Sequence, residues 1–307
     1  MIPEALLAAL PGDKLKRNEP LREYTSFRTG GPAEALLEVD SLPLLRDCLN
    51  LLKQSGTPWF LLGRGTNLLI SDEGFPGLIL KPGGEFEQLS ISENCITAGA
   101  AVSLSSLCSL AASHGLSGLE FASGIPGSVG GGIVMNAGAY GGELGQITRS
   151  VSVLKEGELI RLSREEMEFS YRTSLAKKQE MVVLSAEFVL SPDTPEHIRE
   201  SMRELAQKRR EKQPLEYPSA GSTFKRPEGC FAGKLIQDAG LSGLSVGGAQ
   251  VSEKHCGFIV NKGGATSLDI YTLIRRVQNE VSARFGVLLE PEVICLGEFP
   301  ECPSAQR

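Results

Sequence analysis

Two clusters of glycine constrain this chain most strongly, because glycine permits backbone conformations and close approaches that other residues exclude. The first cluster is the loop Gly63-Arg64-Gly65-Thr66-Asn67, and the second runs from Gly118 to Glu143. The chain of 307 residues contains 35 glycines, well above the average frequency of about 7%. We therefore expect backbone from both clusters to lie close against a bound ligand.

The overall composition is that of a folded, water-soluble protein. Hydrophobic residues make up 41% of the chain and charged residues 22%, which argues against wholesale disorder and a coiled coil. The net charge of −6 argues against a broad basic surface for nucleic acid. The N-terminus lacks a basic region followed by a long apolar stretch, and no later segment reaches about 18 consecutive apolar residues. We expect a cytoplasmic protein without membrane insertion.

The cysteines and histidines give little support for a metal site. Seven cysteines are scattered along the chain without a CxxC pair, which is typical of reduced thiols in a reducing compartment. Of the three histidines only His255 neighbours a cysteine, Cys256. We expect this pair on a strand, where neighbouring side chains point to opposite faces. The favoured interpretation is a buried thiol beside a polar histidine, with no metal bound.

Short strands and helices alternate along the chain. The pattern predicts strands at 34–39, 59–62, 68–70 and 181–190, and a hairpin at 151–162 that turns at Glu156-Gly157. It predicts helices from the cap Ser41 to about residue 54, and at 104–114, 196–212 and 270–285. Turn-forming residues at 191–195 indicate a domain boundary at that point.

Each glycine cluster has two interpretations when taken alone. The loop at 63–67 is either a plain turn between strands or a turn whose amides point at a diphosphate, with Thr66 and Asn67 adding side-chain donors. It matches neither G-x-x-x-x-G-K-[ST] nor a G-x-G-x-x-G followed by a helix. The stretch 118–143 is either a flexible linker or a ligand cradle. Bulky residues spaced through it favour the cradle, namely Phe121, Ile125, Val129, Ile133, Met135 and Tyr140.

Six motifs, taken together and in order, resemble one enzyme family. They are Thr25–Ala33, the loop that begins at Leu62, Gly118–Glu143, Tyr171–Ser174, Ala220–Lys225 and Leu289–Val293. The same motifs occur in this order in the UDP-N-acetylenolpyruvoylglucosamine reductase (MurB) family, and the resemblance spans nearly the whole chain. Several long motifs in a fixed order are far more specific than a single glycine loop.

The resemblance implies an α+β fold. An FAD-binding domain of the vanillyl-alcohol-oxidase (PCMH) type would consist of two subdomains, 1–80 and 81–192, and a C-terminal α+β substrate-binding domain would occupy 193–307. It also implies an NADPH-dependent flavoprotein oxidoreductase of peptidoglycan synthesis. NADPH would reduce non-covalently bound FAD, which would pass hydride to the enolpyruvyl ether of UDP-N-acetylglucosamine and yield UDP-N-acetylmuramate. Another FAD-dependent oxidoreductase on the same scaffold, or a non-catalytic protein that binds flavin or a nucleotide sugar, remains an alternative.

The resemblance further implies the catalytic residues. Hydride transfer leaves an enolate-like charge on the substrate, and Arg172 of the YR motif offers a planar, permanently charged partner for it. Ser222 matches the proton donor, with Lys225 as a candidate helper. Glu292 would assist protonation or hold the enol, and Glu290 is a supporting residue only.

Cofactor and substrate residues are carried over in the same way. Around the FAD diphosphate we expect Gly63, Arg64, Gly65, Thr66 and Asn67. Along the ribityl chain and isoalloxazine we expect Ser123, Gly124, Pro126, Gly127, Ser128, Gly130, Asn136, Ala137 and Gly138. Lys212 and Arg226 are expected to meet the phosphates of the UDP portion. The tyrosine-bearing loop of one branch of the family has no counterpart between Thr173 and Lys212, so the chain resembles the shorter type.

Overall fold

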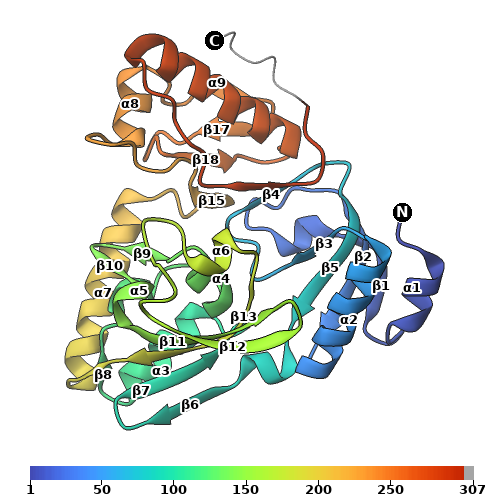
Figure 1. The fold of residues 1–307 in the computed structure, drawn as a ribbon. Helices are drawn as coiled ribbons and strands as arrows, with labels where there is room; N and C mark the ends of the chain where they lie inside the picture. Colours follow the sequence, from blue (N-terminus) through green and yellow to red (C-terminus); the bar gives the residue numbers. More distant parts are fainter. Residues whose placement is uncertain (301–307) are drawn as a thin grey trace.

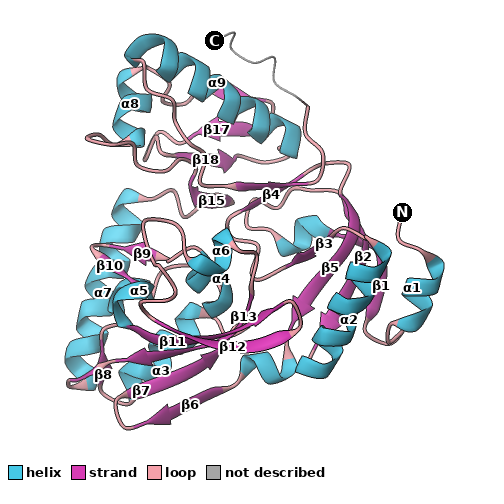
Figure 2. Ribbon diagram, viewed as in Figure 1, coloured by secondary structure: helices cyan, strands magenta, loops and turns pink. Residues whose placement is uncertain are grey.

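The computed structural model describes residues 1–300 of the chain. Figure 1 shows three sheet-containing layers: the N-terminal one at the right, the middle one at the lower left and the C-terminal one at the top. Helices cover the outer sides of the sheets (Figure 2). The site described below lies where segments of all three layers meet.

The N-terminal sheet has the strand order β1-β2-β5-β3. Its strands are β1 (Leu15–Pro20), β2 (Pro32–Val39), β5 (Phe75–Pro82) and β3 (Trp59–Leu61). Helices α1 (Glu4–Ala9) and α2 (Leu42–Ser55) bury leucines against it. Helix α2 ends where Gly56 adopts φ 64°, a left-handed conformation that favours glycine. The 3₁₀ helices η1 (Leu21–Tyr24) and η2 (Gly84–Glu87) follow β1 and β5.

The middle sheet has five antiparallel strands in the order β12-β11-β13-β7-β6. They are β12 (Glu158–Ser163), β11 (Thr148–Lys155), β13 (Val182–Val189), β7 (Cys95–Gly99) and β6 (Leu89–Ser92). The short pair β8 (Leu116–Ser117) and β14 (Ser191–Pro192) lies beside α3 (Leu104–Ser113) and α7 (Pro195–Lys212). Helices α5 (Leu144–Ile147) and α6 (Leu175–Lys178) are one turn each.

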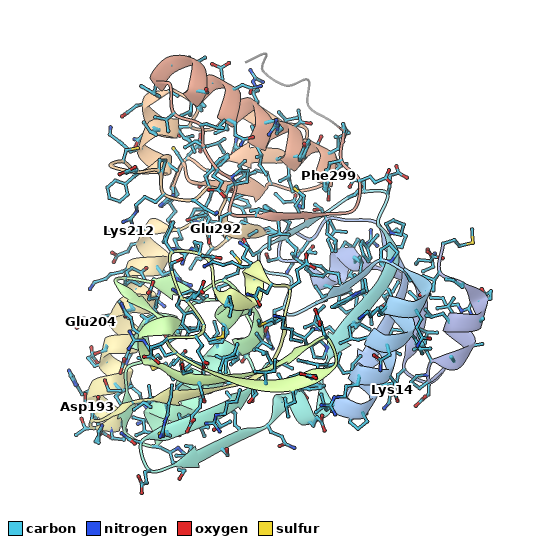
Figure 3. All side chains as sticks on the ribbon, viewed as in Figure 1. Lys14, Asp193, Glu204, Lys212, Glu292 and Phe299 are labelled. Atoms are coloured by element: carbon cyan, nitrogen blue, oxygen red, sulfur yellow. The ribbon has the colours of Figure 1, made fainter. Side chains whose placement is uncertain are left out.

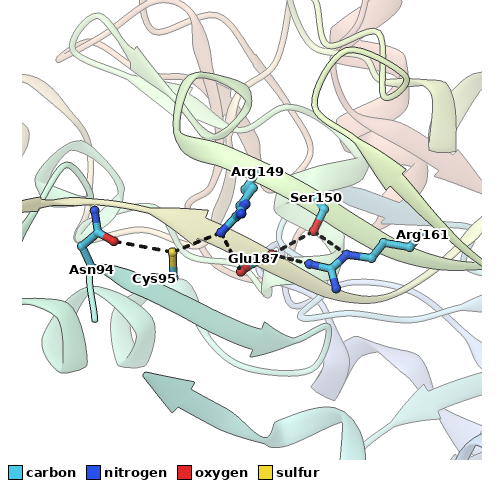
Figure 4. A network of polar contacts seen from close by, with 6 residues as sticks. All are labelled: Asn94, Cys95, Arg149, Ser150, Arg161 and Glu187. Atoms are coloured by element: carbon cyan, nitrogen blue, oxygen red, sulfur yellow. Dashed lines mark hydrogen bonds and ion pairs between the residues drawn. The ribbon is translucent and has the colours of Figure 1, made fainter. Parts of the chain in front are cut away.

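A polar network ties three strands of the middle sheet together (Figure 4). Glu187 on β13 accepts a hydrogen bond from Ser150 Oγ on β11 at 3.1 Å and pairs with the Arg161 guanidinium on β12. Arg149 Nη1 lies 3.6 Å from the other Glu187 oxygen. The single carboxylate therefore holds cations from two neighbouring strands.

The glycine-rich stretch 118–143 has regular structure. It contains the 3₁₀ helix η3 (Glu120–Ala122), α4 (Val129–Val134) and the paired strands β9 (Gly138–Ala139) and β10 (Gly142–Glu143). Val129 and Ile133 are fully buried in the core of the middle layer. The stretch is therefore not a flexible linker.

The C-terminal layer is a four-stranded sheet in the order β15-β18-β17-β16. Its elements are β15 (Ser219–Ser222), β18 (Phe258–Asn261), β17 (Ala249–Val251), β16 (Ser245–Val246), α8 (Ala232–Asp238) and α9 (Ser267–Phe285). The chain then returns to the N-terminal layer, where β19 (Ile294–Leu296) pairs in parallel with β4 (Leu68–Ile70). Asp72 accepts hydrogen bonds at 2.8 Å from the amides of Ser267 and Leu268 at the start of α9.

The helices and strands that were predicted by residue range are present, with ends that agree to within about three residues. One detail is wrong: His255 and Cys256 lie in a turn, where His255 Nδ1 accepts the Gly257 amide, and not on a strand. The predicted domain division at residues 80 and 192 stays a prediction. Helix α7, which that division assigns to the C-terminal domain, packs against α3 and η3 of the middle layer. Cys302 lies outside the described residues. Within residues 1–300, no helix combines the length and apolarity that crossing a membrane requires.

Candidate active site

The two glycine clusters lie against each other. A Cβ atom on Gly63 would stand 2.8 Å from Ser128 Oγ, and one on Gly127 would stand 3.7 Å from Thr66 Oγ1. Gly65 adopts φ 60°, and a Cβ atom there would stand 1.9 Å from the carbonyl oxygen of Tyr24. The loop 63–67 can therefore approach both neighbours only because these positions carry no side chain.

A cavity of about 600 Å³ opens beside this loop. Lys81 in its wall donates to the carbonyl oxygen of Gly63 at 2.6 Å. Burial, reinforced by the positive charge of Arg64, lowers the pKa of Lys81. The hydroxyl of Ser26, also in the wall, is buried and has no hydrogen-bond partner among residues 1–300. Three cations line the cavity, Arg28, Arg64 and Lys81, against two carboxylates, Glu23 and Glu216. This excess of positive charge and the unpartnered hydroxyl beside glycine backbone fit the anionic diphosphate of a dinucleotide such as FAD.

Arg172 and Glu292 meet in an ion pair between distant parts of the chain. Arg172 Nε lies 2.6 Å from Glu292 Oε1, and the two side chains are 21% and 14% exposed. Arg172 Nη2 donates to the carbonyl oxygen of Gly138 in the second glycine cluster at 3.2 Å. Arg172 itself adopts φ 57° in a tight turn closed by Ser170 and Thr173. The contact with Glu292 is electrostatic, since Arg172 Nε has no aligned hydrogen-bond partner among the described residues.

Glu292 lies in a cluster of charged side chains that affect one another's pKa values. Burial raises the pKa of Glu292, and the nearby cations Arg172, Lys225 and Lys177 reduce this effect. Burial and the charge of Lys225 lower the pKa of Lys177. Lys225 forms an ion pair with Glu290. Three cations against two carboxylates leave the cluster positively charged, which favours an anionic ligand.

Ser222 stands at the end of β15 beside the Glu292 segment. Gly221 before it has φ 75°, and the ladder to β18 is irregular at this point. The next residue, Thr223, accepts the Glu292 amide through its carbonyl oxygen at 2.8 Å. The Ser222 side chain is exposed. The fold thus brings Arg172, Ser222 and Glu292 into one region (Figure 3 labels Glu292).

Two of the expected cofactor residues connect the glycine clusters to this region. Asn67 donates through its amide nitrogen to the carbonyl oxygen of Glu292 at 3.0 Å. Asn136, 1% exposed, donates to the carbonyl oxygen of Ser170 at 3.1 Å and accepts the Gly145 amide at 2.8 Å. Both amides therefore hold the framework around Glu292 and Arg172.

The other expected cofactor residues of the second cluster follow its backbone in order. Ser123, Gly124, Pro126 and Gly127 lie between η3 and α4, Ser128 and Gly130 begin α4, and Ala137 and Gly138 follow it. Ser128 Oγ caps α4 by accepting the Gly131 amide at 3.4 Å. Gly130 packs on Ala100, where a Cβ atom would stand 2.9 Å from that of Ala100.

Of the two residues expected to bind phosphate, Lys212 is exposed at the end of α7 nearest the C-terminal layer (Figure 3). Arg226 is also exposed, and its guanidinium carbon lies 4.6 Å from the ring centre of Phe231.

Several charged residues near the site escaped the sequence analysis. Lys81 and Lys177 were not singled out, and neither was Arg209, whose guanidinium lies 3.1 Å from where a Cβ atom of Gly124 would stand. Each belongs to a strand or helix of ordinary pattern, where a cation is normally a solvated surface residue. Only the tertiary structure reveals their position.

Comparisons with known proteins agree with this geometry. Residues 33–163 match the family model described as an FAD binding domain, and residues 213–296 match the C-terminal domain of UDP-N-acetylenolpyruvoylglucosamine reductase. The UDP-N-acetylenolpyruvoylglucosamine reductase of Agathobacter rectalis is 50% identical over 94% of this chain and 96% of its own length. That of Caldanaerobacter subterraneus subsp. tengcongensis is 48% identical over 96% and 98%.

A solved structure is similar over almost the same span. The crystal structure of UDP-N-acetylenolpyruvylglucosamine reductase from Thermus caldophilus is 36% identical, covers 92% of this chain and 99% of its own, and gives a TM-score of 0.81. The expected α+β fold, an FAD-binding domain followed by a C-terminal domain, is confirmed. The chain belongs to the UDP-N-acetylenolpyruvoylglucosamine reductase family.

Proposed function

We propose that this chain reduces UDP-N-acetylglucosamine enolpyruvate to UDP-N-acetylmuramate, a precursor of peptidoglycan, with FAD as cofactor and NADPH as electron donor. FAD, when bound, takes two electrons from NADPH and supplies a hydride to the terminal carbon of the enolpyruvyl double bond. The main supporting observation is the contact between Arg172 and Glu292, formed where both glycine clusters meet the C-terminal layer.

Arg172 would stabilise the negative charge that develops on the substrate carboxylate. Its planar guanidinium presents N–H donors in a fork that matches the geometry of a carboxylate. Its contacts with Gly138 and Glu292 hold it in place before the substrate arrives, so little reorganisation is needed when the charge forms.

Ser222 and Glu292 would handle the proton that completes the reduction at the adjacent carbon. The exposed Ser222 hydroxyl is on the strand next to the Glu292 segment. Glu292 would assist protonation or hold the enol: burial raises the pKa of its carboxyl group, which lies against the Arg172 guanidinium. Lys225 contributes positive charge nearby, although its ammonium is paired with Glu290.

The nucleotide half of the substrate would lie toward Lys212 and Arg226, which offer cations for its phosphates. Both side chains are exposed, and Arg226 follows the Lys225 backbone that bonds to Glu290. These cations would suit the diphosphate of a small nucleotide sugar.

The flavin spectrum tests this function directly. Purified protein should be yellow, its flavin absorbance should bleach on anaerobic addition of NADPH, and it should return on addition of the enolpyruvyl substrate. Bleaching without a substrate-dependent return would indicate another FAD-dependent oxidoreductase. A colourless protein that FAD cannot reconstitute would indicate a non-catalytic binding protein.

Replacing Ser222 by alanine separates the two half-reactions. We expect Ser222→Ala to reduce its flavin with NADPH at nearly the wild-type rate and to reoxidise slowly with substrate, because only the second half-reaction needs the proton. The measurement is stopped-flow absorbance of each half-reaction. An equal loss in both halves would contradict the role of Ser222.

A further inference from the structure

An aromatic ring at the edge of the site is exposed without an obvious packing role. Phe231 is 60% exposed, although the next residue, Ala232, is buried at the start of α8. Arg226 places its guanidinium carbon 4.6 Å from the centre of this ring. That distance is within the range of a cation–π contact, which extends to about 6 Å.

The segment that carries this pair is fixed to the catalytic region. The Arg226 amide donates to the hydroxyl oxygen of Tyr171 at 3.1 Å. Tyr171 precedes Arg172, whose guanidinium carbon lies 5.2 Å from the Tyr171 ring centre and which pairs with Glu292. A continuous series of contacts therefore runs from Glu292 outward to Phe231.

The free edge of the Arg226 guanidinium suits a phosphate. A guanidinium that lies on an aromatic face keeps its N–H groups in the plane of the group, where they remain available to an anion. Arg226 forms no ion pair with any carboxylate among residues 1–300. An arginine held by a ring loses less side-chain entropy on binding than a freely moving one.

We propose that Phe231 is a positioning residue for the nucleotide half of the substrate, because its ring holds the Arg226 guanidinium where it binds the diphosphate. This inference rests on the proposed function and deepens it. In this role Phe231 acts through Arg226, whose guanidinium lies over its ring.

UDP is the probe that tests this role on the FAD-loaded protein. We expect Phe231→Leu, which keeps an apolar side chain without a ring, to weaken UDP binding about two- to fivefold, the range for an exposed cation–π contact. Phe231→Tyr keeps the ring and should bind UDP like the wild type. In steady-state assays Phe231→Leu should raise KM for the nucleotide sugar and leave kcat unchanged.

The same substitution in an Arg226→Ala protein gives the decisive comparison. If Phe231 acts through Arg226, Phe231→Leu should cause no further loss of UDP affinity in that background. An unchanged UDP affinity in Phe231→Leu alone would overturn the inference, and so would an equal loss in both backgrounds. A wild-type protein that does not bind UDP would instead overturn the proposed function, which the Phe231 variants do not test.

Discussion

Replacing Arg172 by lysine tests whether the shape of this cation matters as well as its charge. The guanidinium reaches Glu292 through Nε and the carbonyl oxygen of Gly138 through Nη2. A lysine ammonium is a single charged point, so it cannot keep both contacts in the same geometry. The substrate carboxylate would then meet a cation that has lost one of its two anchors.

The size of the effect follows from these contacts. A hydrogen bond to a charged group is worth about 1.5–3 kcal/mol, which corresponds to roughly a 10- to 150-fold slower reaction. Arg172→Met removes the charge as well. At a charge separation of about 4 Å and an effective dielectric constant of about 20, that charge is worth roughly 4 kcal/mol, or about a 1000-fold slower reaction.

The assay is the rate at which substrate reoxidises the NADPH-reduced flavin. Arg164→Lys is the matched control, because Arg164 is exposed and should react like the wild type. Flavin content and Tm establish that each variant is folded and loaded. Reoxidation of Arg172→Lys within twofold of the wild-type rate would refute the geometric argument, and equal rates for Arg172→Lys and Arg172→Met would refute the contribution assigned to the charge alone.

Three further predictions concern stability and cofactor binding. Burial raises the pKa of Glu292 above 4.5, so as pH rises the unfolded chain releases this proton before the folded protein does. The stability of the wild type should therefore fall as pH rises above about 4.5. Glu292→Gln has no such proton, so its Tm should fall less than that of the wild type over the same pH range. Gly63→Ala forces a methyl group to 2.8 Å from Ser128 Oγ, an overpacking that should cost about 1 kcal/mol of folding stability in a denaturant titration. By pushing the two glycine clusters apart it should also weaken FAD binding in a fluorescence titration, and an FAD affinity equal to that of the wild type would contradict the role of Gly63. Gly12→Ala, with nothing within 4 Å of the added atom, should bind FAD normally. Asp72→Ala removes the acceptor for the first amides of α9 and should cost about 0.5–2 kcal/mol in a denaturant titration; unchanged stability would contradict the capping role.

Local sequence signals predicted part of this fold, but they did not indicate strands β1, β5, β7, β17 and β18 or helices α1 and α8. Helix α2 follows Ser41 and ends at Gly56, whose positive φ is the kind of conformation that glycine favours. The hairpin of β11 and β12 turns at Glu156-Gly157, both with positive φ. These signals lie within a few residues of the feature that they mark.

Local sequence signals do not show which residues come together in the candidate active site. Arg172 and Glu292 are far apart in the sequence, and no periodicity indicates that their side chains meet. Only the resemblance to a family placed them together, and the ion pair between them supports that placement. Lys81 was missed because its importance depends on burial beside Gly63, which the sequence of a single strand does not reveal.

The return of the chain from the C-terminal layer has a consequence for dissecting this protein. Strand β19 pairs with β4, which directly follows the first glycine cluster. An expression fragment that stops after α9 would lack β19. Strand β4, in the N-terminal part of the chain, would then lose the strand to which it is hydrogen-bonded. Strand β19, the last strand that the structure describes, therefore joins the C-terminal layer to the N-terminal part of the chain, and a single cut between the two would separate β19 from β4.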